Sequence, residues 1–166
     1  MAHGDLPADV GTRTLVAVFA APVAAYLLHF GRDAGFHTVL VEPDLDLVDP
    51  LTAGYADGVA SSVDPSFADG NADIVVCDHD RPELGDMLAR ALAYPARWIG
   101  VMGSPRHTGP HIEALRSRGF DDEAIGRVHR PIGLNIGSHS PAEIAISTLA
   151  GLIADRNNRP GGFYRP

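Results

Sequence analysis

The chain alternates between short apolar segments and segments with helical spacing, and this alternation limits the folds open to it. The apolar segments are rich in β-branched residues and have few polar positions, as expected for strands that are buried on both faces. Strands are predicted at 14–19, 37–41, 73–77 and 97–102. Helices are predicted at 23–34, 81–93, 105–118, 121–127 and 140–156.

Strands without polar alternation, separated by helices, predict a mostly parallel sheet with helices on both faces. Right-handed crossovers then give a doubly wound, Rossmann-like α/β fold. With 166 residues, the chain is expected to form a single domain. We expect an N-terminal extension at 1–13, the Rossmann-like domain at 14–156 and a tail at 157–166. The polar stretch before 71 is expected to hold at most a short strand, near Val59.

Composition excludes several classes of function. The formal net charge of -8 argues against binding to nucleic acid or to an anionic membrane. A single cysteine, Cys77, allows neither an internal disulfide nor an all-cysteine metal site. Neither a signal-peptide pattern nor an apolar run of spanning length is visible, so a cytoplasmic location is expected.

Ligands of doubly wound folds bind at the carboxyl ends of the strands. The ends predicted here carry small, polar or turn-forming residues. Turn formation alone also selects such residues, so a ligand site and plain turns both remain possible. The candidate binding residues in these loops are Ala20, Ala21, Glu42, Asp44, His79, Gly103, Ser104 and Arg106.

The loop after the first strand lacks the glycine pattern of dinucleotide-binding proteins. In the G-x-G-x-x-G register, Phe19 and Ala21 stand at the first two glycine positions. Those glycines allow a tight turn and a close approach of the backbone to pyrophosphate. The Cβ atom of Ala21 would block that approach, so poor binding of NAD(P) is predicted.

Two further strand ends allow more than one interpretation. Ser104 followed by Pro105 is typical of a helix start, and with Arg106 it would suit an anion such as phosphate. A simple helix cap explains the same residues equally well. His79 lies between two aspartates, which suits proton transfer, but Asp80 as the N-cap of the next helix is the simpler interpretation. We predict no metal site and no catalytic residue set, although His107 and His111 have a spacing that metal ligands can use.

The segment HRPIGLNIGSHSPAEIAIS, residues 129–147, predicts a rigid loop that leads into a helix. Ser140 and Glu143 form a capping-box pattern around Pro141. We call residues 131–140 the arch. Gly133 and Gly137 permit a left-handed backbone or close packing, and Asn135 can bond to neighbouring turns. The arch is expected to return to the carboxyl edge and to share an anion pocket with residues 103–106. Gly133, Asn135 and Gly137 are its candidate cofactor-binding residues, and the two glycines would leave room for the anion.

Three stretches resemble the Rossmann-like domain of the xanthine dehydrogenase accessory factor family (XdhC/CoxI). They are DHD at 78–80, WIGVMGS at 98–104, and PIGLNIG at 131–137 followed by PAEIA at 141–145. The resemblance implies an accessory factor that transiently binds molybdenum cofactor and helps to insert it into a molybdenum hydroxylase of the xanthine or carbon monoxide dehydrogenase type. It implies a non-catalytic maturation chaperone rather than an enzyme.

The chain departs from that family in three places. The family often carries a glycine-rich turn where Phe19 and Ala21 stand, and usually has aspartate at the position of Asn135. Members commonly carry an N-terminal domain with a cysteine motif. Here either a separate partner protein supplies that domain, or the chain is a reduced relative that has lost part of the activity. An NAD(P)-dependent oxidoreductase and a non-binding dimerising scaffold remain as alternatives. The small residues of the last helix favour a homodimer through 141–155 or the adjacent sheet edge.

Overall fold

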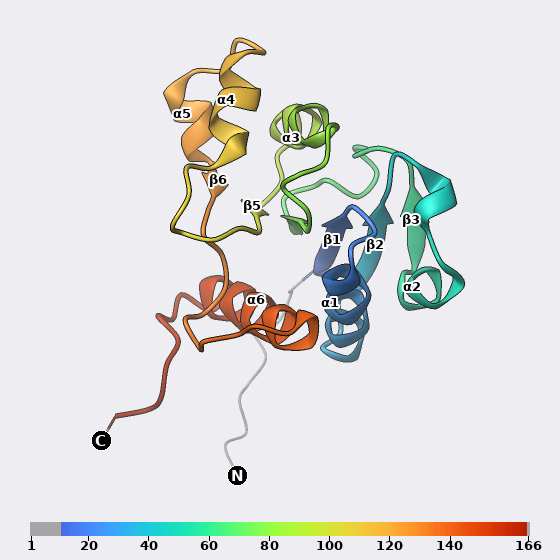
Figure 1. Ribbon diagram of the computed structural model, residues 1–166. Coiled ribbons are helices and arrows are strands. Elements are labelled where there is room, and N and C mark those ends of the chain that lie inside the picture. The colour runs from blue at the N-terminus through green and yellow to red at the C-terminus, as the bar shows by residue number, and fades with distance from the viewer. Residues whose placement is uncertain (1–10, 166) are drawn as a thin grey trace.

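The computed structural model describes residues 11–165, which form one sheet of six parallel strands covered by helices on both faces (Figure 1). The strand order is β3-β2-β1-β4-β5-β6, so the direction of strand addition reverses between β1 and β4. This is the order of the dinucleotide-binding Rossmann fold. The prediction of a doubly wound, Rossmann-like fold is confirmed. The strands are β1 (Thr14–Val18), β2 (His37–Val41), β3 (Gly58–Ala60), β4 (Ala72–Val76), β5 (Trp98–Val101) and β6 (Val128–His129).

The helices divide between the two faces of the sheet. Figure 1 shows α1 and α6 on one face and α3, α4 and α5 on the other, with α2 beside the β3 edge. A short 3₁₀ turn, η1 (Leu45–Leu47), precedes α2. The helices are α1 (Pro22–Asp33), α2 (Pro50–Tyr55), α3 (Leu84–Leu92), α4 (Pro110–Arg116), α5 (Asp122–Gly126) and α6 (Pro141–Arg156).

Each central strand contributes to two hydrophobic cores. Side chains alternate between the two faces of a strand. Leu15 and Ala17 of β1 therefore pack in the core under α1 and α6, whereas Val16 and Val18 pack in the core under α3, α4 and α5. All five residues of β1 are buried, which explains why the strand shows no polar alternation.

The last helix is tied to the amino edge of the sheet by charged side chains. Asp73 of β4 is fully buried, and its carboxylate accepts hydrogen bonds from Nε of Arg97 at 2.6 Å and from Nε of Arg156 at 2.8 Å. Arg156 also donates to the carbonyl of Asn71. Because the end of α6 is held at the amino edge, its beginning is directed toward the carboxyl edge, where ligands of this fold bind.

Two predicted helix starts are wrong. The helix expected at 105 begins at Pro110, and Ser104 Oγ instead accepts the N–H of Arg106 within a turn. The helix expected at 81 begins at Leu84. Asp80 does not cap it: its own N–H donates to Asp78 Oδ1. In both places a local side chain–backbone bond takes the group that the predicted cap required.

The remaining differences concern short elements and the ends of the chain. The sequence did not predict α2 or β6, and both are very short. Most of the expected N-terminal extension lies outside the described residues, so the proposed domain limits stay predictions. Within residues 11–165, none of the helices combines the length and apolar composition needed to cross a bilayer.

Candidate functional site

The candidate site is the carboxyl edge of the sheet, where the strand order reverses. The N–H of Phe19 donates to Val41 at 2.7 Å, that of Cys77 to Val18 at 2.9 Å, and that of Met102 to Val76 at 3.0 Å. These bonds align the ends of β1, β2, β4 and β5 along one edge. The loops that follow these strands are therefore brought together, as expected. They contain Ala20, Ala21, Glu42, Asp44, His79, Gly103, Ser104 and Arg106.

Phe19 adopts a backbone conformation that normally belongs to glycine. Its φ is 76°, its side chain is fully buried, and the guanidinium of Arg81 lies 4.5 Å from the centre of its ring. A left-handed backbone is costly for a bulky residue and persists only where the surroundings enforce it. The tight turn after β1 is thus kept without its glycine. The obstacle to pyrophosphate at this loop is then the Cβ atom of Ala21 rather than the side chain of Phe19.

Glu42 occupies the centre of the edge and is bonded to other groups of the protein. Its side chain is fully buried and accepts four hydrogen bonds. Two come from the N–H groups of Ala20 at 2.8 Å and Asp44 at 3.0 Å. The other two come from Nη1 and Nη2 of Arg81, at 2.9 and 2.7 Å. In this arrangement the carboxylate of Glu42 and the Ala20 amide are both bonded within the protein, and ligand contact by Glu42 stays a prediction.

The charge of Glu42 is stabilised despite its burial. Burial alone would raise the pKa of this carboxyl, but the bonds from Arg81 and from the amides of Ala20 and Asp44 outweigh it and hold the pKa below its usual value. Arg81 is a residue of this edge that was not predicted from the sequence. Its only signal was its place directly after the DHD loop. Its side chain is 17% exposed and also contacts Glu83.

The other residues of the β2 and β4 ends are simpler. Asp44 is exposed, and its carboxylate accepts the N–H of Asp46. His79 is half-buried, with Nε2 3.6 Å from Asp80 Oδ1. Burial raises the pKa of Cys77 to about 12, so its thiol stays protonated at neutral pH. Residues 11–165 hold no cluster of three or more His, Cys, Asp or Glu side chains that could bind a metal ion.

The first half of the arch packs along α6. Leu134 donates its N–H to the carbonyl of Ser147 at 3.1 Å, and Ser147 Oγ donates to the carbonyl of Leu134 at 2.6 Å. A Cβ atom on Gly133 would lie 2.5 Å from Ser147 Oγ, and the φ of Gly133 is 85°. Gly133 is therefore required for contact with the helix. The contact with α6 therefore accounts for the glycine at position 133, which was expected to leave room for a ligand.

The second half of the arch leads to the beginning of α6. Asn135 and Gly137 are exposed there, and Gly137 has a φ of 70°. The predicted capping box is confirmed: Ser140 Oγ accepts the N–H of Glu143, whose carboxylate accepts the N–H groups of Ser140 and His139. These bonds use the N–H of Glu143 in the first turn and the N–H groups of the two residues before the helix.

Arg130 connects the arch to the β5–α4 loop. It directly precedes the arch, and its Nη1 donates to the carbonyl of His107 at 2.9 Å. Its guanidinium also lies against Gly103, where a Cβ atom would collide with it. The two segments predicted to share a pocket are therefore joined through Arg130, a residue that the sequence analysis did not select. Arg106 lies exposed on the same loop.

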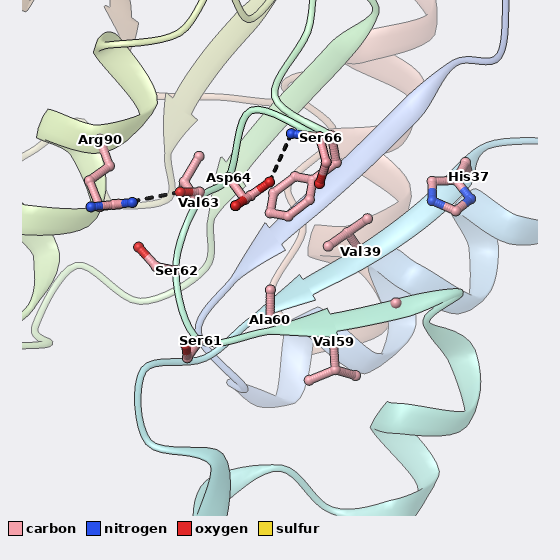
Figure 2. Close-up of a pocket in the computed structure, with 12 residues that line it drawn as sticks. His37, Val39, Val59, Ala60, Ser61, Ser62, Val63, Asp64, Ser66 and Arg90 are labelled. Atoms are coloured by element: carbon pink, nitrogen blue, oxygen red, sulfur yellow. Dashed lines mark hydrogen bonds between the residues drawn. The ribbon is translucent and has the colours of Figure 1, made fainter.

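A cavity of about 490 Å³ lies along β3, from His37 at the start of β2 to Ala60 and Ser61 at the end of β3. Figure 2 shows Arg90 at one end of it and His37 at the other, with Val39 and Ala60 between them. The N–H of Ser66 donates to Asp64 Oδ1 at 2.8 Å on the same wall. None of the residues predicted to bind a ligand lines this cavity.

Comparisons with known proteins agree with the fold and the motifs. Residues 15–152 match the XdhC Rossmann domain. A stretch of 78 residues, 47% of this chain, is 40% identical to the uncharacterized protein YqeB of Escherichia coli strain K12, of which it covers 14%. The structure is similar to that of a xanthine dehydrogenase from Bacillus halodurans, with a TM-score of 0.70 and 25% identity, over 89% of this chain and 45% of that one.

The chain thus spans less than half the length of either relative. The family match covers β1 through most of α6, so it includes both the carboxyl edge and the arch. From this match we conclude that the chain belongs to the XdhC Rossmann domain family.

Proposed function

We propose that this chain is the Rossmann module of an accessory factor that helps to mature a molybdenum hydroxylase of the xanthine dehydrogenase type. In this proposal it holds molybdenum cofactor at the carboxyl edge and passes it to the client enzyme without catalysing a reaction. The observation that carries the proposal is the XdhC match across residues 15–152. The name of the Bacillus halodurans relative supports a link to xanthine dehydrogenase.

The site residues are compatible with the phosphate of molybdenum cofactor but oppose the standard pose of a dinucleotide. A Cβ at Ala21 and a buried Glu42 that takes the Ala20 amide both oppose the standard dinucleotide pose. By contrast, the β5–α4 loop offers Arg106 in solvent and a glycine, Gly103, against which an arginine lies. Arg106 and His79 would hold the cofactor, which supplies the molybdenum and its dithiolene when bound. An oxidoreductase that uses NAD(P) is therefore the less favoured function.

Partners follow from the same proposal. The client is a molybdenum hydroxylase. A homodimer is also part of the proposal. Pull-down of the chain with a xanthine dehydrogenase from the same organism tests the client directly, and a client that matures equally well without the chain would contradict it.

Cofactor binding is tested with molybdenum cofactor released from a donor molybdoenzyme. We expect molybdenum, measured by mass spectrometry, to co-elute with the chain in gel filtration. Arg106→Ala should weaken binding by about 1.5–3 kcal/mol if Arg106 makes a charge-assisted bond. Arg116→Ala, which removes an arginine exposed on α4, is the matched control. Equal retention of molybdenum by both variants would exclude Arg106, and no retention by the unchanged chain would refute cofactor binding.

A further inference from the structure

The cavity along β3 has an apolar floor and an aromatic wall. Val39 and Gly58 pair in register across β2 and β3, so they face the same side of the sheet, as does Ala60 two residues later. Phe67, from the segment between β3 and β4, adds a ring to the lining. A volume of about 490 Å³ is typical of pockets that hold small organic molecules. The cavity therefore has room and apolar surface for the body of such a molecule.

Two opposite charges line this cavity without forming an ion pair. Arg90 of α3 donates its Nε to the carbonyl of Val63 at 3.3 Å, and Oδ1 of Asp64 accepts the N–H of Ser66 at 2.8 Å. Within residues 11–165 these are the bonds that hold the two charged groups, which leaves Nη1 and Nη2 of Arg90 and Oδ2 of Asp64 available. Both side chains are exposed, so a ligand can reach them.

Asp64 stays charged in this setting. The bonds from Ser66, and more weakly the charge of Arg90, hold the pKa of Asp64 below its usual value. Its carboxylate is therefore ionised at neutral pH. The cavity thus presents one cation and one anion that influence each other but are not matched to each other.

The far end of the cavity holds a histidine that already faces a carboxylate. Nδ1 of His37 lies 3.5 Å from Oδ2 of Asp57. Figure 2 shows His37 at the opposite end from Arg90, with Val39 and Ala60 between them. A ligand that uses the two unmatched charges therefore lies at the Arg90 end and extends its apolar part along Val39 and Ala60.

We infer that this cavity binds an α-amino acid with a large apolar side chain, its carboxylate on Arg90 and its ammonium on Asp64. A guanidinium donates charge-assisted bonds to both oxygens of a carboxylate. An α-amino acid carries its two charges on neighbouring groups, so one small molecule can bridge the two side chains. Its apolar side chain packs against Val39, Ala60 and Phe67, away from water.

The pair of charges selects against simpler ligands. A plain carboxylate would bring a second negative charge beside Asp64, and a plain amine would bring a second positive charge beside Arg90. Like charges held together oppose binding. The cavity lies outside the loops to which the proposed function assigns molybdenum cofactor, so this site goes beyond that function and is tested without the cofactor.

Calorimetric titration with related compounds tests the inference. We expect the unchanged chain to bind one molecule of phenylalanine, methionine or leucine. Phenylpropanoate lacks the ammonium of phenylalanine and phenethylamine lacks its carboxylate, so each should bind about tenfold more weakly or less. Failure of all three amino acids to bind would overturn the inference. Binding of phenylpropanoate or phenethylamine as tight as that of phenylalanine would also overturn it, because one charge would then suffice.

Charge variants test the two side chains. Arg90→Gln and Asp64→Asn should each weaken phenylalanine binding about tenfold or more. Arg116→Gln removes an exposed arginine of α4, and Asp69→Asn changes an aspartate that accepts the N–H of Asn71 in the same way as Asp64 accepts that of Ser66. Both controls should bind phenylalanine as the unchanged chain does. Equal affinity of either cavity variant and its control would overturn the inference.

Glycine variants test the space without removing a charge. A Cβ atom on Gly58 would meet no other atom within 4 Å, so Gly58→Val fills part of the cavity and should abolish phenylalanine binding. Gly70→Val adds the same side chain at an equally open position outside the cavity and should leave binding intact. Thermal unfolding establishes that each variant is folded. Binding of phenylalanine by folded Gly58→Val would overturn the inference, and if that variant does not fold, the two charge variants decide.

Discussion

Glu42 takes up a backbone N–H of the β1–α1 loop, the loop that binds pyrophosphate in dinucleotide-binding proteins. It stands at the end of β2, yet its carboxylate points into the protein and takes both the Ala20 amide and the guanidinium of Arg81. An internal carboxylate thus occupies donors that another protein of this fold offers to its ligand. The position of Glu42 at a strand end was predictable from the sequence. Its partner was not, because Arg81 reaches it from a different loop, 39 residues later in the chain.

The Glu42–Arg81 pair should contribute strongly to stability. We expect Glu42→Gln to lower the free energy of unfolding by about 3 kcal/mol at pH 7, because the change removes the buried charge that pairs with Arg81 and leaves that guanidinium only its longer contact with Glu83. Asp86→Asn removes the partner of Arg118 in an exposed pair and should cost less than about 1 kcal/mol. Urea unfolding measures both, and equal losses would contradict a special role for the buried pair.

The free energy of unfolding that Glu42 contributes should decrease at acid pH. The pKa of Glu42 is lower in the folded protein than in the unfolded chain, so the folded state binds the proton less readily. The stability it contributes is fully present above the unfolded pKa of about 4.3 and is lost as the pH falls through the folded pKa. The difference in the free energy of unfolding between the unchanged chain and Glu42→Gln should therefore become smaller as the pH falls.

The long elements could be predicted from sequence, whereas several of their starting residues could not. Apolar runs identify β1, β2, β4 and β5, because their side chains are buried whatever their neighbours are. A helix start depends on which acceptor each amide finds. At Ser104 the pattern Ser-Pro predicts a cap, but the hydroxyl bonds to Arg106 in a turn. At Ser140 the same pattern forms the predicted capping box, because Glu143 returns the bond.

This contrast predicts different costs for the same substitution. Ser140→Ala should lower the free energy of unfolding by about 1 kcal/mol, the usual cost of losing an N-cap. Ser104→Ala should change it by less than half of that, because Ser104 begins no helix and is exposed. Chemical denaturation of the two variants provides the comparison. A larger loss of unfolding free energy in Ser104→Ala than in Ser140→Ala would contradict this prediction and show that the β5–α4 loop contributes more to stability than its contacts indicate.

The β1–α1 loop predicts the response to nucleotides. Calorimetric titration with NAD and NADP should show no binding in the low micromolar range, since the Ala21 Cβ opposes the close approach of a pyrophosphate and the Ala20 amide is already bonded to Glu42. Ala21→Gly should not restore binding by itself, because Glu42 still holds the amide. Tight stoichiometric binding of NAD or NADP to the unchanged chain would refute this prediction and favour an oxidoreductase function.

At the scale of the whole molecule, the topology followed from the sequence, but the contact that closes it did not. Alternating strands and helices predicted the parallel sheet, and the handedness of crossovers limited its order. The clamp of Asp73 by Arg97 and Arg156 joins residues up to 83 positions apart. Charged residues at the ends of predicted elements give no sign of which distant partner they meet.

The homodimer is a prediction about the outer surface of α6 and the arch. The small residues of α6 pack within the chain, against α1 and the arch. Ile136 of the arch and Ile146 of α6 are each about half exposed. We expect light scattering to give a dimer mass, and Ile146→Asp to give a monomer. Leu51→Asp changes an exposed leucine on α2 and should leave the dimer intact. A monomer mass for the unchanged chain at high concentration would exclude the dimer.

The clamp at Asp73 also sets the order in which a new chain can complete its structure. The apolar face that carries Leu15, Ala17 and Val75 is covered by α1 and α6, and α6 is translated after every strand of the sheet. While the ribosome is still making the arch, α1 covers only part of that face, and exposed apolar surface of this kind promotes aggregation. The final turn, with Arg156, brings the helix to Asp73. The α6 side of this core is therefore the last part of the sheet to be covered while residues 11–165 are synthesised.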